Sequence, residues 1–148
     1  MIFRIACYQG VNGVLFGATQ EEVAVHWGKP DRHRTTTLGE RSESRGEMRC
    51  VYNSGRLVEI GFGPSCIVTI QDVADVLHNF SALNNLLVLD PSPYEAYGFL
   101  VFFELGITLT GVHDGDDSQL AATAFSHGRW SKSESGMTPW HRNVPNQK

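Results

Sequence analysis

The sequence predicts an α+β fold in which helices pack on one face of an antiparallel sheet. Two observations support this prediction: a short segment with helix-capping signals at both ends is followed by alternating apolar strands, and the second half of the chain repeats that order. Residues 1–130 are therefore expected to form one domain of two similar helix-plus-strand units, about 1–64 and 65–130. A polar tail at 131–148 is expected to follow.

The first unit is organised around the segment Gly17–Asp31, which reads as one short helix. Thr19 is a good N-cap residue, and Glu22 three positions later completes a capping box. Gly28 can adopt the left-handed conformation that ends a helix, and Pro30 prevents the helix from continuing. The start and the end of this helix are thus both indicated by local residues.

Strands are expected on either side of this helix. β-Branched and aromatic residues predict a first strand over Ile2–Tyr8, and alternation predicts a hairpin of Met48–Tyr52 with Leu57–Phe62. The intervening segment 31–46 is polar and charged. Its alternation is compatible with a ragged hairpin whose flexible tip covers 38–46.

The second unit begins with an extended segment at 66–70. Thr69 and Asp72 resemble a second N-cap with an acidic third position, and apolar residues from Val73 to Phe80 fall at helical spacing. These features predict a second helix, which residues 81–89 extend by a turn or two before Asp90-Pro91-Ser92-Pro93 breaks it.

Three strands are expected after that break, at about 97–103, 106–112 and 119–126, with a turn at 113–117. The resulting antiparallel sheet has helices on one face only. Its other face is expected to be partly free, which makes that face a candidate for binding.

Composition excludes several classes of protein. The 148 residues are 41% hydrophobic with a formal net charge of −4, so no domain-wide basic excess indicates nucleic-acid binding. No stretch approaches the ~20 apolar residues that a membrane span needs, and the N-terminus does not resemble a signal peptide, so a cytoplasmic location is expected. Cys7, Cys50 and Cys66 are widely spaced and have apolar neighbours, so they are expected to be free, buried thiols.

The acidic segment Asp114-Gly115-Asp116-Asp117 is too short for a calcium loop of the EF-hand type, because residues 118–120 lead directly into a strand. It is expected to be a solvated turn, or an acidic finger that enters a basic cleft of a partner. The six histidines show no metal-ligand spacing, and no nucleophile motif is present. No metal, cofactor or catalytic residue is therefore expected.

One local basic cluster occurs in the polar segment and the strand after it. It consists of Arg32, Arg34, Arg41, Arg45 and Arg49. Glutamates at 40, 43 and 47 are interleaved with these arginines, so the net field is expected to be small. A solvated hairpin is the favoured interpretation, ahead of a phosphate-binding arm.

Residues 17–23 and 27–31 resemble the signature of BamE/SmpA-like domains. Beta-lactamase-inhibitory proteins share that helix-plus-sheet unit as a tandem pair. The later segments 105–109 and 124–130 resemble small bacterial proteins built from such a pair, some of which are immunity proteins for secreted toxins. The resemblance covers about 14–130 and implies a binding scaffold. The lipidated cysteine of BamE-type members is not present, so a role in outer-membrane assembly is not implied.

These features together predict a non-enzymatic protein-binding module, in its sharpest form an immunity protein that occludes a bacterial toxin. The expected contact residues are Asp114, Asp116 and Asp117 with the aromatic anchors Tyr94 and Tyr97. Two alternatives stay open. One is a small ligand-binding domain or enzyme with a pocket between helices and sheet, and the other is a subunit whose sheet face forms a homodimer.

Overall fold

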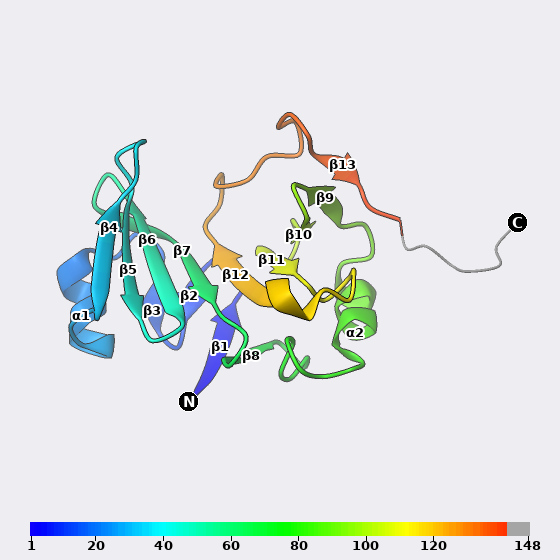
Figure 1. Cartoon of the computed structure of the whole chain (residues 1–148), viewed down its shortest axis with the longest axis horizontal. Coiled ribbons are helices and arrows are strands. Elements are labelled where there is room, and N and C mark those ends of the chain that lie inside the picture. Colours follow the sequence, from blue (N-terminus) through cyan, green and yellow to red (C-terminus); the bar gives the residue numbers. More distant parts are fainter. Residues whose placement is uncertain (142–148) are drawn as a thin grey trace, which may run out of the picture.

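The computed structural model describes residues 1–141, which form two β-sheets and two short helices (Figure 1). Strands hold 38% of these residues and helices 13%. The strands are β1 (Ile2–Ala6), β2 (Gly10–Val11), β3 (Val14–Leu15), β4 (Arg32–Thr35), β5 (Arg41–Arg45), β6 (Met48–Asn53), β7 (Arg56–Phe62), β8 (Ile67–Ile70), β9 (Tyr94–Ala96), β10 (Phe99–Phe102), β11 (Ile107–Thr110), β12 (Ala121–Phe125) and β13 (Thr138–Pro139). The helices are α1 (Gln20–Trp27) and α2 (Ala82–Leu89), with a 3₁₀ turn η1 at Asp117–Gln119.

The large sheet has nine strands in the order β13-β9-β10-β11-β12-β7-β6-β5-β4, and all its neighbouring strands are antiparallel. Its centre is the pairing of β7 with β12, in which Gly61 lies opposite Thr123. These strands are far apart in the sequence. Their pairing joins the meander β4–β7 to the later strands in one continuous sheet.

The small sheet has the order β3-β2-β1-β8. Its β1–β2 pair is antiparallel, whereas β1 and β8 are parallel, with Ile5 opposite Ile70. The N-terminal strand is thus paired with a strand more than sixty positions later. The small sheet packs on the large one, where the rings of Phe3 and Phe62 lie 4.9 Å apart between centroids. The main core lies between the two sheets and also takes in Val23 of α1 and Leu86 of α2.

The predicted fold class is wrong. The chain is mostly β, with two sheets and two short helices, and it is not a tandem of helices packed on a sheet. The layer that covers the large sheet is in large part the small sheet, with one helix from each half of the chain beside it. Apolar spacing reports that a segment is buried, but it does not say whether a helix or a second sheet buries it.

Local predictions are confirmed where the capping signals or the strand alternation are strong. In α1, the Thr19 hydroxyl accepts from the Glu22 N–H at 3.2 Å, and the Glu22 carboxylate accepts from the Thr19 N–H at 2.9 Å. Gly28 ends the helix with a φ of 79°. The predicted hairpin of β6 and β7 is also confirmed.

The predicted second helix over 71–80 is wrong. Gln71 and Asp75 have φ values of 49° and 51°, which interrupt any helix there. Val73, Val76 and Leu77 are buried all the same, because Val73 forms a bridge with Ile70 and the Val76 N–H donates to Val68 O at 2.8 Å. Phe80 at the end of the segment is fully exposed. The second helix, α2, lies within the predicted extension at 81–89.

Two further boundaries differ from the prediction. Residues 41–45, assigned to a flexible tip, form the regular strand β5, and the turn of that hairpin occupies 36–40. The strand expected over 97–103 is the shorter β10, and a turn at Tyr97-Gly98 separates it from β9, a strand that was not predicted. Tyr97 has a φ of 55°, so this turn cannot be read as continuous strand.

Part of the predicted tail is ordered by contact with the sheet. Thr138 and Pro139 form β13 on the edge of β9, and the Trp140 N–H donates to Pro93 O at 3.0 Å. The rest of that tail, residues 142–148, lies outside the described residues. Within residues 1–141, neither helix is long and apolar enough to cross a membrane.

Candidate functional site

One side of strands β4–β7 and β12 faces away from the small sheet and carries three arginines. Residues directly opposite each other on neighbouring strands point to the same side of a sheet. One such row runs Arg32–Ser44–Arg49–Gly61–Thr123, and the next begins Arg34–Ser42–Val51. We call this surface the arginine face and define it by Arg32, Arg34 and Arg49.

The opposite side of the same hairpin holds the other two arginines of the basic cluster. Arg41 Nε lies 2.9 Å from a carboxylate oxygen of Glu43, and Arg45 Nη2 lies 3.7 Å from the other. Glu43 is only 4% exposed. Arg41, Glu43 and Arg45 are therefore an internal ion-pair group beneath β5, and they contribute no free positive charge to the arginine face.

A second ion-pair group occupies the border of the arginine face. Arg129 Nε lies 3.0 Å from Glu59, and the Arg129 guanidinium donates two hydrogen bonds to Glu40. These bonds hold the pKa of the Glu40 carboxyl below its usual range. Glu40 was expected to offset the charge of the nearby arginines, but its ion-pair partner is Arg129, 89 positions away.

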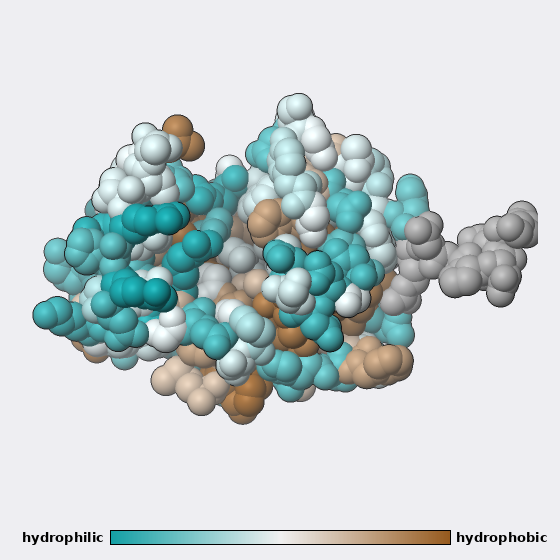
Figure 2. Space-filling model, viewed as in Figure 1, coloured by the Kyte–Doolittle hydropathy of each residue, from teal (hydrophilic) through white to brown (hydrophobic). Residues whose placement is uncertain are grey.

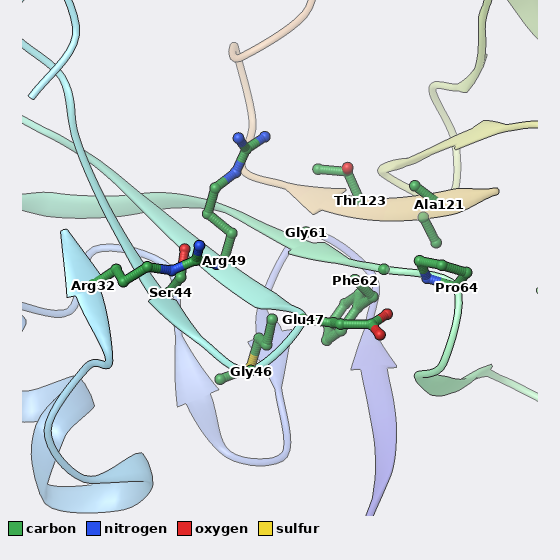
Figure 3. A pocket seen from close by; sticks show the side chains of 13 residues that line it. Arg32, Ser44, Gly46, Glu47, Arg49, Gly61, Phe62, Pro64, Ala121 and Thr123 are labelled. Carbon is green, nitrogen blue, oxygen red and sulfur yellow. The ribbon is translucent and has the colours of Figure 1, made fainter. Parts of the chain in front are cut away.

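Glu47 is the third glutamate that the sequence places among these arginines. Its carboxylate accepts from the Ser65 N–H at 2.9 Å, and this backbone hydrogen bond lowers its pKa. Glu47 lines the arginine face at the end near Pro64, whereas Arg32 and Arg49 reach out from the other side (Figure 3). The expected cancellation of charge thus applies to the ion-paired groups, whereas on the arginine face Glu47 offsets the positive charge only at one end.

Among residues 1–141, none forms a salt bridge with Arg32, Arg34 or Arg49. All three are exposed. Hydrophilic side chains gather over this part of the molecule (Figure 2). Although the whole protein carries a net negative charge, the arginine face is locally positive.

Small side chains make this surface concave. Ser44 lies between Arg32 and Arg49 in the paired row, and Gly61 follows Arg49 on the next strand. A hollow of about 390 Å³ extends from Arg32 across Gly61 to Thr123 (Figure 3). A second hollow of about 300 Å³ is lined by both serines of β5 together with Arg32, Arg34 and Arg49.

The predicted aspartates lie elsewhere, in the loop between β11 and β12. Asp114, Asp116 and Asp117 are exposed. Asp114 and Asp116 accept hydrogen bonds from the N–H groups of Asp116 and Ser118, respectively. These bonds give the loop a defined shape, and its role in binding stays a prediction.

The predicted aromatic anchors are not gathered beside those aspartates. His113 connects the acidic loop to Glu95 on β9 at 2.8 Å, and alternation places Tyr94 on the other side of that strand. The Tyr94 ring packs edge-on against Phe103. Tyr97 is 72% exposed, and its hydroxyl donates to Ser135 O at 2.7 Å. The joint role of these five residues in binding stays a prediction.

The arginine face could have been found in part from the sequence. Arg32-His33-Arg34-Thr35 and Arg41-Ser42-Glu43-Ser44-Arg45 both alternate with the period of a strand. Treated as paired strands, they place the serines on one side and Glu43 with its arginines on the other. The contribution of Arg49 depends on the register between β5 and β6, which no local signal specifies.

The described residues contain no group of three or more His, Cys, Asp or Glu side chains that could hold a metal ion. Cys7, Cys50 and Cys66 are free thiols, but only Cys50 is buried as predicted, and Cys7 and Cys66 are partly exposed. Burial raises the pKa of the Cys50 thiol to about 11, so this thiol stays protonated at neutral pH.

No protein-family model, curated protein or solved structure matches this chain. The resemblance to BamE/SmpA-like domains stays a hypothesis, and the function has to be inferred from the site itself.

Proposed function

We propose that this protein is a binding module that holds an acidic protein partner against the arginine face. The observation that supports this proposal is the separation of the arginines. Arg41, Arg45 and Arg129 are ion-paired within the fold, whereas Arg32, Arg34 and Arg49 stand exposed and unpaired around one concave surface. Like charges gathered in this way repel one another, and an acidic partner relieves that repulsion.

Arginine suits such a surface better than lysine does. Its planar guanidinium can bind a carboxylate through two parallel hydrogen bonds, and it is less strongly hydrated than an ammonium group. Arginine is also among the residues in which interface energy concentrates. Arg49 lies on β6, which is paired on both sides, and Arg32 and Arg34 lie on the edge strand β4, which is paired with β5. The backbone beneath these side chains is therefore already ordered before binding.

Occlusion of a toxin's active cleft by this face would make the protein an immunity protein, which is the sharper form of the proposal. The mechanism requires no chemical step by this chain. The three guanidinium groups would bind carboxylates at the rim of the cleft, and the sheet would block access to it. Identification of the captured partner tests this form.

The test is capture of a partner from a lysate of the source organism, followed by association kinetics with two matched triple variants. One variant replaces Arg32, Arg34 and Arg49 with Gln, and the other replaces Asp114, Asp116 and Asp117 with Asn. We expect the arginine variant to associate about tenfold more slowly or worse at low salt, and the difference to shrink as salt screens it.

The aspartate variant serves as the control and also tests the contact residues predicted from sequence. We expect its association rate to stay within about twofold of the parent rate, because the acidic loop is not part of the arginine face. If the aspartate variant associates slowly with the partner and the arginine variant associates at the parent rate, the partner binds the acidic loop and the arginine face is the wrong site.

A small anionic ligand is the second candidate, favoured by the hollow of about 390 Å³ between Arg32 and Thr123, a size that suits such ligands. This hollow lies on the side of the large sheet away from the main core, to which both helices contribute, and so not in the expected place between helices and sheet. Thermal melting with citrate or pyrophosphate tests it. A rise in Tm that disappears in the arginine variant would favour a small ligand over a protein partner.

A further inference from the structure

We propose that the partner contributes an extended acidic segment that pairs with the outer edge of β4 as an additional strand of the large sheet. This inference rests on the proposed function and specifies how the partner is held. The edge of β4 borders the arginine face, because Arg32 and Arg34 belong to both. A strand added there places its side chains directly beside the two guanidinium groups.

The backbone of β4 has hydrogen-bonding groups available on its outer side. Arg32 and Arg34 lie opposite Ser44 and Ser42, in the same phase as the turn in which the Thr36 N–H donates to Glu40 O at 2.7 Å. In an antiparallel pair, residues of this phase direct both backbone groups toward the neighbouring strand, and the residues between them direct theirs away. The N–H and C=O groups of His33 and Thr35 therefore face outward.

Nothing in residues 1–141 pairs with that edge. β4 is the last strand of the large sheet, and all four of its residues are exposed. A row of unpaired backbone donors and acceptors is a template for another strand. Two outward-facing residues supply up to four backbone hydrogen bonds to such a strand.

The other strand edges are shorter or closed. The edge strand β3 of the small sheet has only two residues. At the far end of the large sheet, β13 has only two residues, and one of them is Pro139, which has no N–H to donate. In the small sheet, β8 bonds on its outer side with the Val73 and Val76 segment. The edge of β4 is thus the more accessible template.

The positive charge of Arg32 and Arg34 determines which kind of segment can pair with the edge of β4. In an added strand, every second side chain lies on the arginine face next to Arg32 or Arg34, so carboxylates at alternate positions meet the guanidinium groups. A second copy of this protein does not fit, because β4 paired with β4 sets arginines beside arginines, and like charges on adjacent strands are destabilising. The edge therefore rejects its own copy and selects an acidic strand.

The experiment uses the full chain and a synthetic peptide of alternating Glu and Thr with an N-terminal fluorophore. A peptide of the same composition with consecutive glutamates and an alternating Lys–Thr peptide are the controls. We expect the alternating Glu–Thr peptide to bind best, and amide exchange measured by NMR to slow specifically at His33 and Thr35. Replacing Arg32 and Arg34 with Gln should weaken its binding roughly two- to thirtyfold.

Thr35→Pro isolates the backbone contribution. Proline removes the outward N–H of Thr35 without removing a hydrogen bond to β5, and proline is tolerated on edge strands. We expect Thr35→Pro to weaken peptide binding about tenfold while all charges of the arginine face remain. Circular dichroism and thermal melting verify that the variant is folded. If it is not, amide exchange in the parent protein decides the question.

Failure of this inference can be told from failure of the proposed function. Unchanged peptide affinity in Thr35→Pro, unprotected His33 and Thr35 amides, or no peptide binding at millimolar concentration overturns strand addition. The captured partner tests the arginine face separately. If the captured partner associates slowly with the arginine variant but at the parent rate with Thr35→Pro, it binds the arginine face without adding a strand.

Discussion

The outer side of the large sheet has two halves that differ in what covers them. On β9–β12, the outward residues include Val101 and Phe125, which are buried together with Met137 beneath the segment that follows β12. On β4–β7, the outward residues include Arg34 and Arg49, which no described segment covers. Both halves belong to the same sheet and follow the same alternation.

This difference shows that the residue composition of each half depends on whether another segment covers it. In the covered half, Phe125 packs edge-on against Tyr8 with ring centroids 5.6 Å apart, and the Trp130 ring lies 6.4 Å away. The open half substitutes serine, glycine and arginine at equivalent positions. Arg129 marks the border, because its ion pairs with Glu40 and Glu59 fasten the covering segment to the meander.

The largest effect on stability is expected in the covered half. Phe125→Ala removes a ring that is only 1% exposed, and we expect it to lower the free energy of unfolding by about 3–5 kcal/mol. Thr123→Ala, two residues earlier on the same side of β12, is the matched control, with an expected cost below about 1 kcal/mol. Urea midpoints compare the two. Equal costs would show that the covering segment does not protect a core.

A substitution at the border between the halves should lower the free energy of unfolding by an intermediate amount. Arg129→Gln breaks partly buried hydrogen bonds to Glu40 and Glu59, and we expect it to cost about 1–3 kcal/mol at neutral pH. The measurement is the Tm of parent and variant from neutral to acidic pH.

The pH dependence follows from the lowered pKa of Glu40. A carboxyl whose pKa is lower in the folded state contributes stability above its ordinary pKa of 4.5, and this contribution is lost as the pH falls through the lowered value. The Tm difference between parent and Arg129→Gln should therefore narrow in acid. A difference that stays constant across that range would show that the ion pair with Glu40 contributes nothing.

The smallest effect on stability is expected in the open half. The combined replacement of Arg32, Arg34 and Arg49 with Gln breaks no ion pair in the described residues, so the free energy of unfolding should change by no more than about 0.5 kcal/mol. We expect relief of repulsion among the arginines to raise the Tm slightly at low salt only. A loss comparable to that of Arg129→Gln would show that these arginines hold the fold together.

Some of the fold could be predicted because it depends on neighbouring residues. The capping box of Thr19 and Glu22, the glycine that ends α1, and the alternation in β6 and β7 act over a few positions. By contrast, the segment 71–80 has helical apolar spacing but an irregular backbone. Hydrogen bonds to β8 hold this segment in place, and residues with positive φ angles interrupt any helix. The predicted site shows the same division: the acidic loop was located correctly as a turn, but Tyr94 and Tyr97 do not lie with it.

The sequence by itself determined the first helix, the central hairpin and the existence of a basic cluster, since these follow from local hydrogen bonding and strand periodicity. Only the tertiary structure decided that β1 pairs with β8, that β7 pairs with β12, and that Arg129 neutralises Glu40. Register and long-range ion pairs depend on the burial of distant segments against one another, which a local pattern does not encode. That is why Arg32, Arg34 and Arg49 form an exposed positive surface, while Arg41 and Arg45, from the same cluster, are ion-paired with the buried Glu43 on the other side of β5.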